Sequence, residues 1–174
     1  MEFNCTYKEK LNYRRKNIGL TINDVSRMLN LSPQGYMARI QRRNISWGLN
    51  EICLVLNAFE CTYEELFITT DLYYQENIDY TLEIKEDLKL AFRKMYLKTK
   101  TRNKDIIKEL NLTRQNFYHA LKAKRFRITH INTILKFYDT TFEDLFCEKI
   151  IVEVKNKNEK ERSLFIWVME NVLL

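Results

Sequence analysis

An internal repeat constrains the fold of this chain more than any other feature of its sequence. LNLSPQGYMARI at 29–40 aligns with LNLTRQNFYHAL at 110–121, an offset of 81 residues. Farther along, ECTYEELF at 60–67 aligns with DTTFEDLF at 139–146, an offset of 79 residues. The difference of two residues falls near 43–48, where we expect a surface loop that is longer in the first copy. A repeat of this extent predicts two similar structural units in one chain.

Each copy of the repeat has the pattern of short helices. The chain has only 3 Gly and 1 Pro in 174 residues, so it lacks most of the residues that form the turns of all-β folds. In the first copy, Asn23 is a candidate cap for one helix, and Ser32 caps a second helix that begins at Pro33. Asn30 and Asn111 lie in the turn between such helices, where asparagine tolerates the left-handed conformation. A mainly α fold is therefore expected.

The apolar spacing of the second helix predicts which side faces the core. Tyr36 and Ile40, and in the other copy Phe117 and Leu121, are four residues apart and are expected to point inward. Further apolar helices are expected at 49–59 and 128–138.

Positive charge is concentrated in the second half of the chain. The net charge is +2 over 1–68, −5 over 69–87, +9 over 88–147 and zero over 148–174. A local excess of nine positive charges suits a polyanion such as DNA, because neutralising phosphates releases their counterions. The acidic stretch at 69–87 contains Tyr73, Tyr74 and Tyr80, which favour an ordered bridge over a loose linker.

The cysteines and the N-terminus favour a soluble protein of the reducing cytoplasm. Cys5, Cys53, Cys61 and Cys147 form no C-x-x-C pair, so we expect free buried thiols and no metal site. The first residues lack the apolar core of a signal peptide, and no apolar run is long enough to span a membrane.

Motifs for enzymatic chemistry are missing. The sequence has no glycine-rich phosphate loop, no H-E-x-x-H and no nucleophile elbow. The Glu64-Glu65 and Glu143-Asp144 clusters follow Thr62 and Thr141 at expected helix starts, which indicates a structural role. We therefore expect no enzyme and no cofactor.

The order of these motifs resembles the Cro/C1-type (XRE-like) helix-turn-helix family of phage and mobile-element regulators. The shared features are the L-N-L turn, S/T-x-Q followed by an aromatic residue, a loop, a helix and a closing T-[YF]-E-[ED]-L-F, over about 7–67 and 90–146. The turn glycine common in the family is replaced by Asn30 and Asn111. The resemblance implies tandem helix-turn-helix bundles in a cytoplasmic, sequence-specific regulator of transcription that binds double-stranded DNA, a repressor. The corresponding segments are a first helix-turn-helix domain at 1–68, an acidic connector at 69–87, a second, basic helix-turn-helix domain at 88–147, and a packing or dimerisation segment at 148–174.

The same resemblance implies a set of DNA-contacting residues. In the family, the second helix of the motif enters the major groove. Gln34 and Gln115 are the leading base readers, because glutamine can bond N6 and N7 of adenine together. The implied base-reading set is Gln34, Met37, Ala38, Arg114, Gln115, Tyr118 and His119. The implied phosphate-binding set is Ser32, Arg39, Arg42, Arg43, Thr113, Lys122, Lys124, Arg125 and Arg127.

Two questions stay open at this stage. The apolar segment 164–174 fits a helix or a β-hairpin strand, and it either packs on the second domain or forms a homodimer interface. The alternative function is an anti-CRISPR-like interaction protein, in which one helix-turn-helix domain autoregulates transcription and another part binds a host nuclease or its RNA. In this alternative the partners of the chain are DNA and a host protein or ribonucleoprotein. Neither hypothesis involves a membrane.

Overall fold

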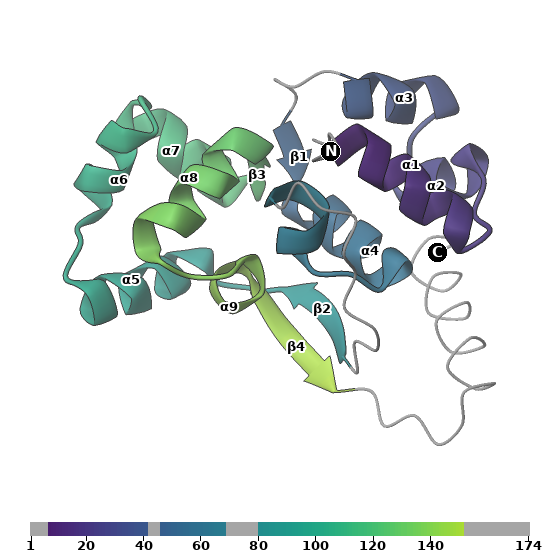
Figure 1. Cartoon of the computed structure of the whole chain (residues 1–174). Helices are drawn as coiled ribbons and strands as arrows, with labels where there is room; N and C mark the ends of the chain where they lie inside the picture. The colour runs from purple at the N-terminus through teal and green to yellow at the C-terminus, as the bar shows by residue number, and fades with distance from the viewer. Residues whose placement is uncertain (1–6, 42–45, 69–79, 152–174) are drawn as a thin grey trace, which may run out of the picture.

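The computed structural model describes residues 7–41, 46–68 and 80–151. The protein is mainly helical, with a small antiparallel strand component (Figure 1). This confirms the expected mainly α class, and the tandem helix-turn-helix arrangement stays a prediction. The predicted apolar segment at 164–174 lies outside the described residues.

The elements of the first half recur in the same order in the second half. The first half contains α1 (Tyr7–Asn17), α2 (Ile22–Met28), α3 (Pro33–Gln41), β1 (Ser46–Gly48), α4 (Leu49–Phe59) and the short π-helix η1 (Glu64–Ile68). The second half contains α5 (Leu88–Thr99), α6 (Asn103–Glu109), α7 (Arg114–Lys122), β3 (Arg125–Arg127), α8 (Ile128–Tyr138) and α9 (Phe142–Phe146). Two strands lie outside this order, β2 (Tyr80–Ile84) and β4 (Cys147–Ile151). The change of offset falls between α3 and β1, as the alignment predicts.

The residue that caps α2 is Thr21, and the prediction of Asn23 was wrong. The Asp24 amide donates to the Thr21 hydroxyl at 3.2 Å, and the Thr21 amide donates to the Asp24 carboxylate at 2.7 Å. The Thr21 hydroxyl also donates to this carboxylate at 2.6 Å, and the two hydrogen bonds from Thr21 to the carboxylate hold the pKa of Asp24 below its usual value. A threonine followed three residues later by an acid is a capping-box pattern, so the sequence contained the information needed to predict Thr21 as the cap of α2.

The turns before α3 and α7 have the same geometry. Asn30 and Asn111 both have φ of 51°, which confirms the left-handed conformation expected there. After each turn a hydroxyl caps the next helix: Ser32 accepts from the amide of Gly35 at 3.0 Å, and Thr113 accepts from the amide of Asn116 at 3.1 Å. Each half therefore contains two helices joined by one tight turn.

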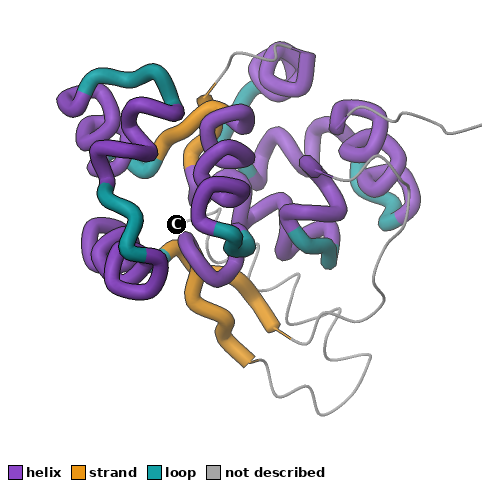
Figure 2. The backbone as a smooth tube through the Cα atoms, turned by 60° about the vertical axis from the view of Figure 1, so that its left-hand side comes forward, coloured by secondary structure: helices purple, strands orange, loops and turns teal. Residues whose placement is uncertain are grey.

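Equivalent residues of the two halves meet across an approximate two-fold axis. In the antiparallel pairing of β1 with β3, Trp47 lies opposite Phe126, its counterpart at the 79-residue offset. Tyr63 and Phe142, which are also counterparts, stack with ring centroids 4.6 Å apart and an interplanar angle of 10°. Helices α3 and α7 lie to either side of the β1–β3 ribbon in Figure 1, and Figure 2 separates this ribbon from the β2–β4 sheet. The two halves of the chain are thus related to each other approximately as the two subunits of a symmetric dimer are.

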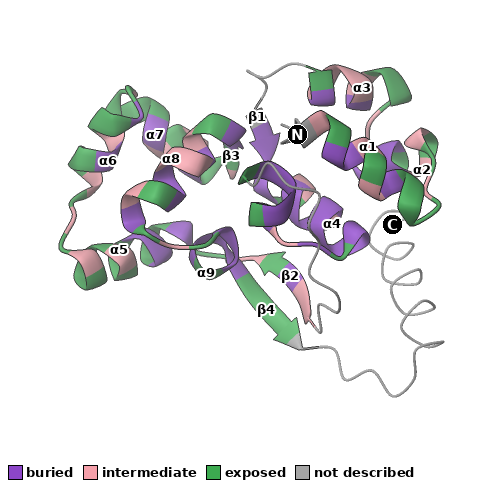
Figure 3. Cartoon of the chain, in the orientation of Figure 1, coloured by how far each residue is buried: buried purple, intermediate pink, exposed green. Residues whose placement is uncertain are grey.

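The core is continuous between the two halves. Buried residues of both halves form one hydrophobic cluster, and Trp47 and Phe126 are each only 1% exposed (Figure 3). The residues predicted to face inward in α3 and α7 are buried: Tyr36, Ile40, Phe117 and Leu121. The division of the chain into separate domains stays a prediction.

One acid of each predicted pair, Glu65 and Glu143, has a structural role. Glu65 accepts from the amide of Thr62 at 2.7 Å within its own half. Glu143 is buried, and its carboxylate accepts from the amide of Tyr63 at 2.8 Å, across the junction between the halves. Buried carboxylates that accept backbone hydrogen bonds stabilise the fold, which confirms the structural interpretation for Glu65 and Glu143.

The second sheet makes part of the acidic connector an ordered element. β2 pairs antiparallel with β4, from Tyr80 opposite Ile151 to Ile84 opposite Cys147. The side chain of Asn57 in α4 donates to the carbonyl of Leu82 at 2.9 Å and accepts from its amide at 2.8 Å. One buried amide side chain thus joins the first half to the connector.

Replacing this asparagine should destabilise the protein. Asn57→Ala leaves the amide and carbonyl of the buried Leu82 without partners. We expect the free energy of unfolding to fall by about 3 kcal/mol, since each unsatisfied buried group costs about 1–3 kcal/mol. The measurement is urea denaturation, with Asn50→Ala, an exposed position of the same helix, as the control. Equal unfolding midpoints for the two variants would contradict the assignment.

Candidate nucleic-acid interface

Helix α7 presents a polar and cationic face to solvent. Arg114, Gln115, His119 and Lys122 are exposed, and Tyr118 is half-buried. The guanidinium of Arg114 lies 5.8 Å from the centroid of the Tyr118 ring, within range of a cation–π contact. The residues predicted on this helix to read bases therefore lie together on one accessible face.

Helix α3 presents a more neutral face. Gln34 and Gln41 are exposed, whereas Met37 and Ala38 are half-buried, and Met37 also packs against the core. Gln34 and Gln115 occupy equivalent positions, two residues after the capping hydroxyls Ser32 and Thr113. Both capping hydroxyls accept hydrogen bonds from their own helices, and their O–H groups remain able to donate to a phosphate beside the backbone amides of the first turn.

Arg39, which the resemblance placed among the phosphate-binding residues, is largely enclosed by the protein. Its guanidinium forms an ion pair with Glu51 and lies 6.0 Å from the centroid of the Trp47 ring, and its side chain is 15% exposed. Glu51 also accepts from the amide of Gly48 at 2.6 Å and lies 3.7 Å from Arg125 of the other half. The sequence signal for the role of Glu51 was its place three residues after Gly48, the residue that precedes α4.

The second half replaces this ion pair with other residues. The counterparts of Arg39 and Glu51 are Ala120 and His130. His130 is half-buried, and desolvation together with the charge of Arg127 lowers its pKa, so it is neutral at pH 7. The two copies therefore differ in the charges that flank their exposed helices.

Lys124 contributes to the junction between the halves. It has φ of 50°, its carbonyl accepts from the amide of Leu49 at 2.8 Å, and its ammonium donates to the carbonyl of Lys85 at 3.2 Å. This hydrogen bond uses one of the three N–H donors of the ammonium, so it restrains the side chain and leaves two donors for a phosphate. Lys122, Arg125 and Arg127 are exposed. Arg42 and Arg43 lie outside the described residues.

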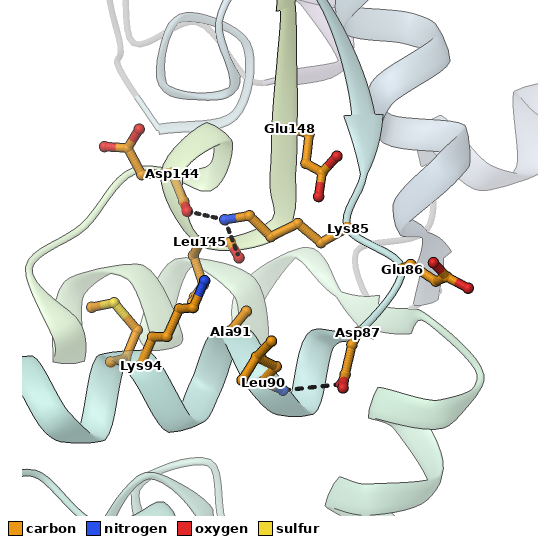
Figure 4. Close-up of a pocket in the computed structure, with 10 residues that line it drawn as sticks. Lys85, Glu86, Asp87, Leu90, Ala91, Lys94, Asp144, Leu145 and Glu148 are labelled. Carbon is orange, nitrogen blue, oxygen red and sulfur yellow. Dashed lines mark hydrogen bonds between the residues drawn. The ribbon is translucent and has the colours of Figure 1, made fainter.

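A groove of about 310 Å³ lies between the start of α5, α9 and β4 (Figure 4). Charges of both signs line it, and the ammonium of Lys85 is directed to the carbonyls of Asp144 and Leu145. Desolvation lowers the pKa of Lys85. These contacts give the lysine a structural role.

Three of the cysteines are buried. Cys53, Cys61 and Cys147 are free, and the sulfur atoms of Cys53 and Cys147 lie 3.4 Å apart. Burial raises the pKa of Cys61 to about 12, so this thiol is a poor nucleophile at neutral pH. The prediction of free buried thiols is confirmed for these three cysteines, and Cys5 lies outside the described residues. Within the described ranges, no three His, Cys, Asp or Glu side chains are grouped to hold a metal ion.

No similarity to a known protein indicates what this interface binds. No family model matches the chain, and searches of curated proteins and of solved structures found no match. In the part of the chain that the structure describes, no helix has the length and apolar character needed to cross a membrane.

Proposed function

We propose that this chain is a sequence-specific regulator of transcription, a repressor, that binds double-stranded DNA through two helix-turn-helix units. The observation that carries the proposal is the symmetric pairing of Trp47 with Phe126, which relates α3 and α7 by an approximate two-fold axis. Helix-turn-helix proteins usually obtain this symmetry by dimerising, so that two recognition helices reach two half-sites one helical turn apart. Here one chain supplies both helices.

The exposed side chains support the same proposal. Each of the two helices follows a tight turn and carries an exposed glutamine two residues after its cap, Gln34 in α3 and Gln115 in α7. Glutamine in this place can bond an adenine edge in the major groove. Lys122, Arg125 and Arg127 then contact phosphates beside α7, with Arg114 at its first turn.

The deciding experiment is selection of bound sequences from random duplex DNA. In the selected motif, Gln34→Ala and Gln115→Ala should each relax the preference at one base pair, at a cost of about 1–3 kcal/mol in binding free energy. Glu83→Ala in β2, an exposed position distant from α3 and α7 in Figure 1, is the control. If both glutamine variants select the wild-type motif unchanged, these helices do not read the bases.

A protein-interaction module is the second candidate function. The observation that favours it lies on α5, where Leu90, Tyr96 and Leu97 are 46%, 40% and 57% exposed. Apolar side chains on a basic helix suit a protein or ribonucleoprotein partner, such as the host nuclease of an anti-CRISPR-like factor. A selection that enriches no duplex sequence would favour this candidate.

A further inference from the structure

We infer that the chain recognises a non-palindromic DNA site and binds it in one fixed orientation. The inference rests on the proposed DNA-binding function and specifies the sequence that this function requires. A homodimer places two identical helices on its half-sites and therefore selects a palindrome. In this chain the two helices related by the axis have different outward residues.

The equivalent outward positions of α3 and α7 define two unlike reading surfaces. In chain order they pair Pro33 with Arg114, Gln34 with Gln115, Met37 with Tyr118, Ala38 with His119, and Gln41 with Lys122. Only the glutamine pair is the same in both helices. An adenine contact is therefore expected in each arm of the site, and the other base preferences are expected to differ between the arms.

Arg114 is expected to give the arm of the DNA site that α7 reads a preference for guanine that the other arm lacks. Its exposed guanidinium lies on the first turn of α7 and can donate to O6 and N7 of guanine, the commonest base-specific contact of arginine. Pro33, at the same place in α3, has no donor. A guanine is therefore expected in the arm read by α7 and not at the matching position of the other arm.

The next turn of each helix reinforces the difference. Met37 and Ala38 are apolar and half-buried, so in α3 they suit contact with a thymine methyl group. Tyr118 and His119 carry polar groups and can hydrogen-bond to bases or phosphates. The ion pair of Arg39 with Glu51 adds to the difference, because its counterparts in the second half are Ala120 and His130.

The test is to give α7 the residues of α3 at the three unlike positions that are assigned to bases, while Lys122, which is assigned to a phosphate, is kept. Arg114→Pro, Tyr118→Met and His119→Ala together make the two helices alike at these positions. The backbone accepts the proline, because position 114 begins the helix and Thr113 before it is extended, with ψ of 154°. Tyr118→Met places in α7 the residue that packs at the same position of α3.

Selection from random duplex DNA is carried out with the full-length wild type and with the triple variant. The wild type should select adenine in both arms and guanine in one arm, whereas the variant should select two matching arms. A palindromic wild-type motif would overturn the inference and leave DNA binding intact. If neither protein selects a motif, the proposed function itself fails.

A second measurement needs no variant. Two palindromes are built by duplicating each arm of the selected wild-type site, and the affinity of the wild-type protein for each is compared with its affinity for the selected site. We expect both palindromes to bind at least about tenfold more weakly, since one wrong base contact costs about 1–3 kcal/mol. Equal affinity for either palindrome would overturn the inference.

Discussion

The affinity of the full chain for duplex DNA is expected to fall about 100-fold between about 50 and 200 mM salt, because each neutralised phosphate lowers log K by about 0.9 per decade of salt. The estimate assumes that four cations around α7 each neutralise about one phosphate, either directly or from within the groove. They are Arg114, Lys122, Arg125 and Arg127. All four are exposed, and Arg125 also lies 3.7 Å from Glu51. Arg39 and Lys124 are left out of the estimate because they are half-buried and bonded within the protein. The measurement is fluorescence anisotropy with a selected duplex at several salt concentrations.

Removal of single charges tests which cations contribute. Lys122→Gln introduces the residue found at the equivalent position of α3, Gln41, and should make the slope shallower by about 0.9. Lys89→Gln removes one exposed charge from α5, which is drawn below α7 in Figure 1, and should leave the slope unchanged. An affinity that does not respond to salt would exclude phosphate contacts at α7, and equal slopes for these two variants would exclude one by Lys122.

Phe126→Ala is expected to lower the free energy of unfolding by about 3–5 kcal/mol, the usual range for removing a large aromatic side chain from a core. The ring is 1% exposed and lies opposite Trp47 where the two halves pair. It also contacts Phe117 and Phe146, with ring centroids 6.4 and 6.3 Å away. The loss therefore affects both the packing beneath α7 and the junction between the halves. Urea denaturation measures the effect.

Comparison of two phenylalanines makes this test specific to the junction. Phe137→Ala, in α8, removes the same group from a half-buried position and should cost clearly less. Trp47→Ala removes the side chain of the paired residue, and its effect should not add fully to that of Phe126→Ala, because directly paired residues of antiparallel strands have their side chains on the same face. Fully additive losses in the double variant would show that the halves do not share this contact.

Local features of the chain were predictable because they depend on residues close in sequence. The left-handed turns at Asn30 and Asn111, and the hydroxyl caps of α3 and α7, involve only a few adjacent residues. The spacing of apolar residues identified the buried side of each helix for the same reason. The cap of α2 was predicted wrongly because Asn23 was preferred to Thr21, although both lie within one helical turn.

The sequence by itself therefore determined the repeat, the helical class and the outward positions of α3 and α7. Only the tertiary structure decided how the two copies meet, because no local pattern specifies that Trp47 lies opposite Phe126, 79 residues away. The same holds for the ion pair that holds Arg39 beside Glu51 and for the bond from Lys124 to Lys85. A long cationic side chain takes whichever acceptor the folded chain brings near, so its sequence position alone does not show whether it contacts the protein or faces solvent.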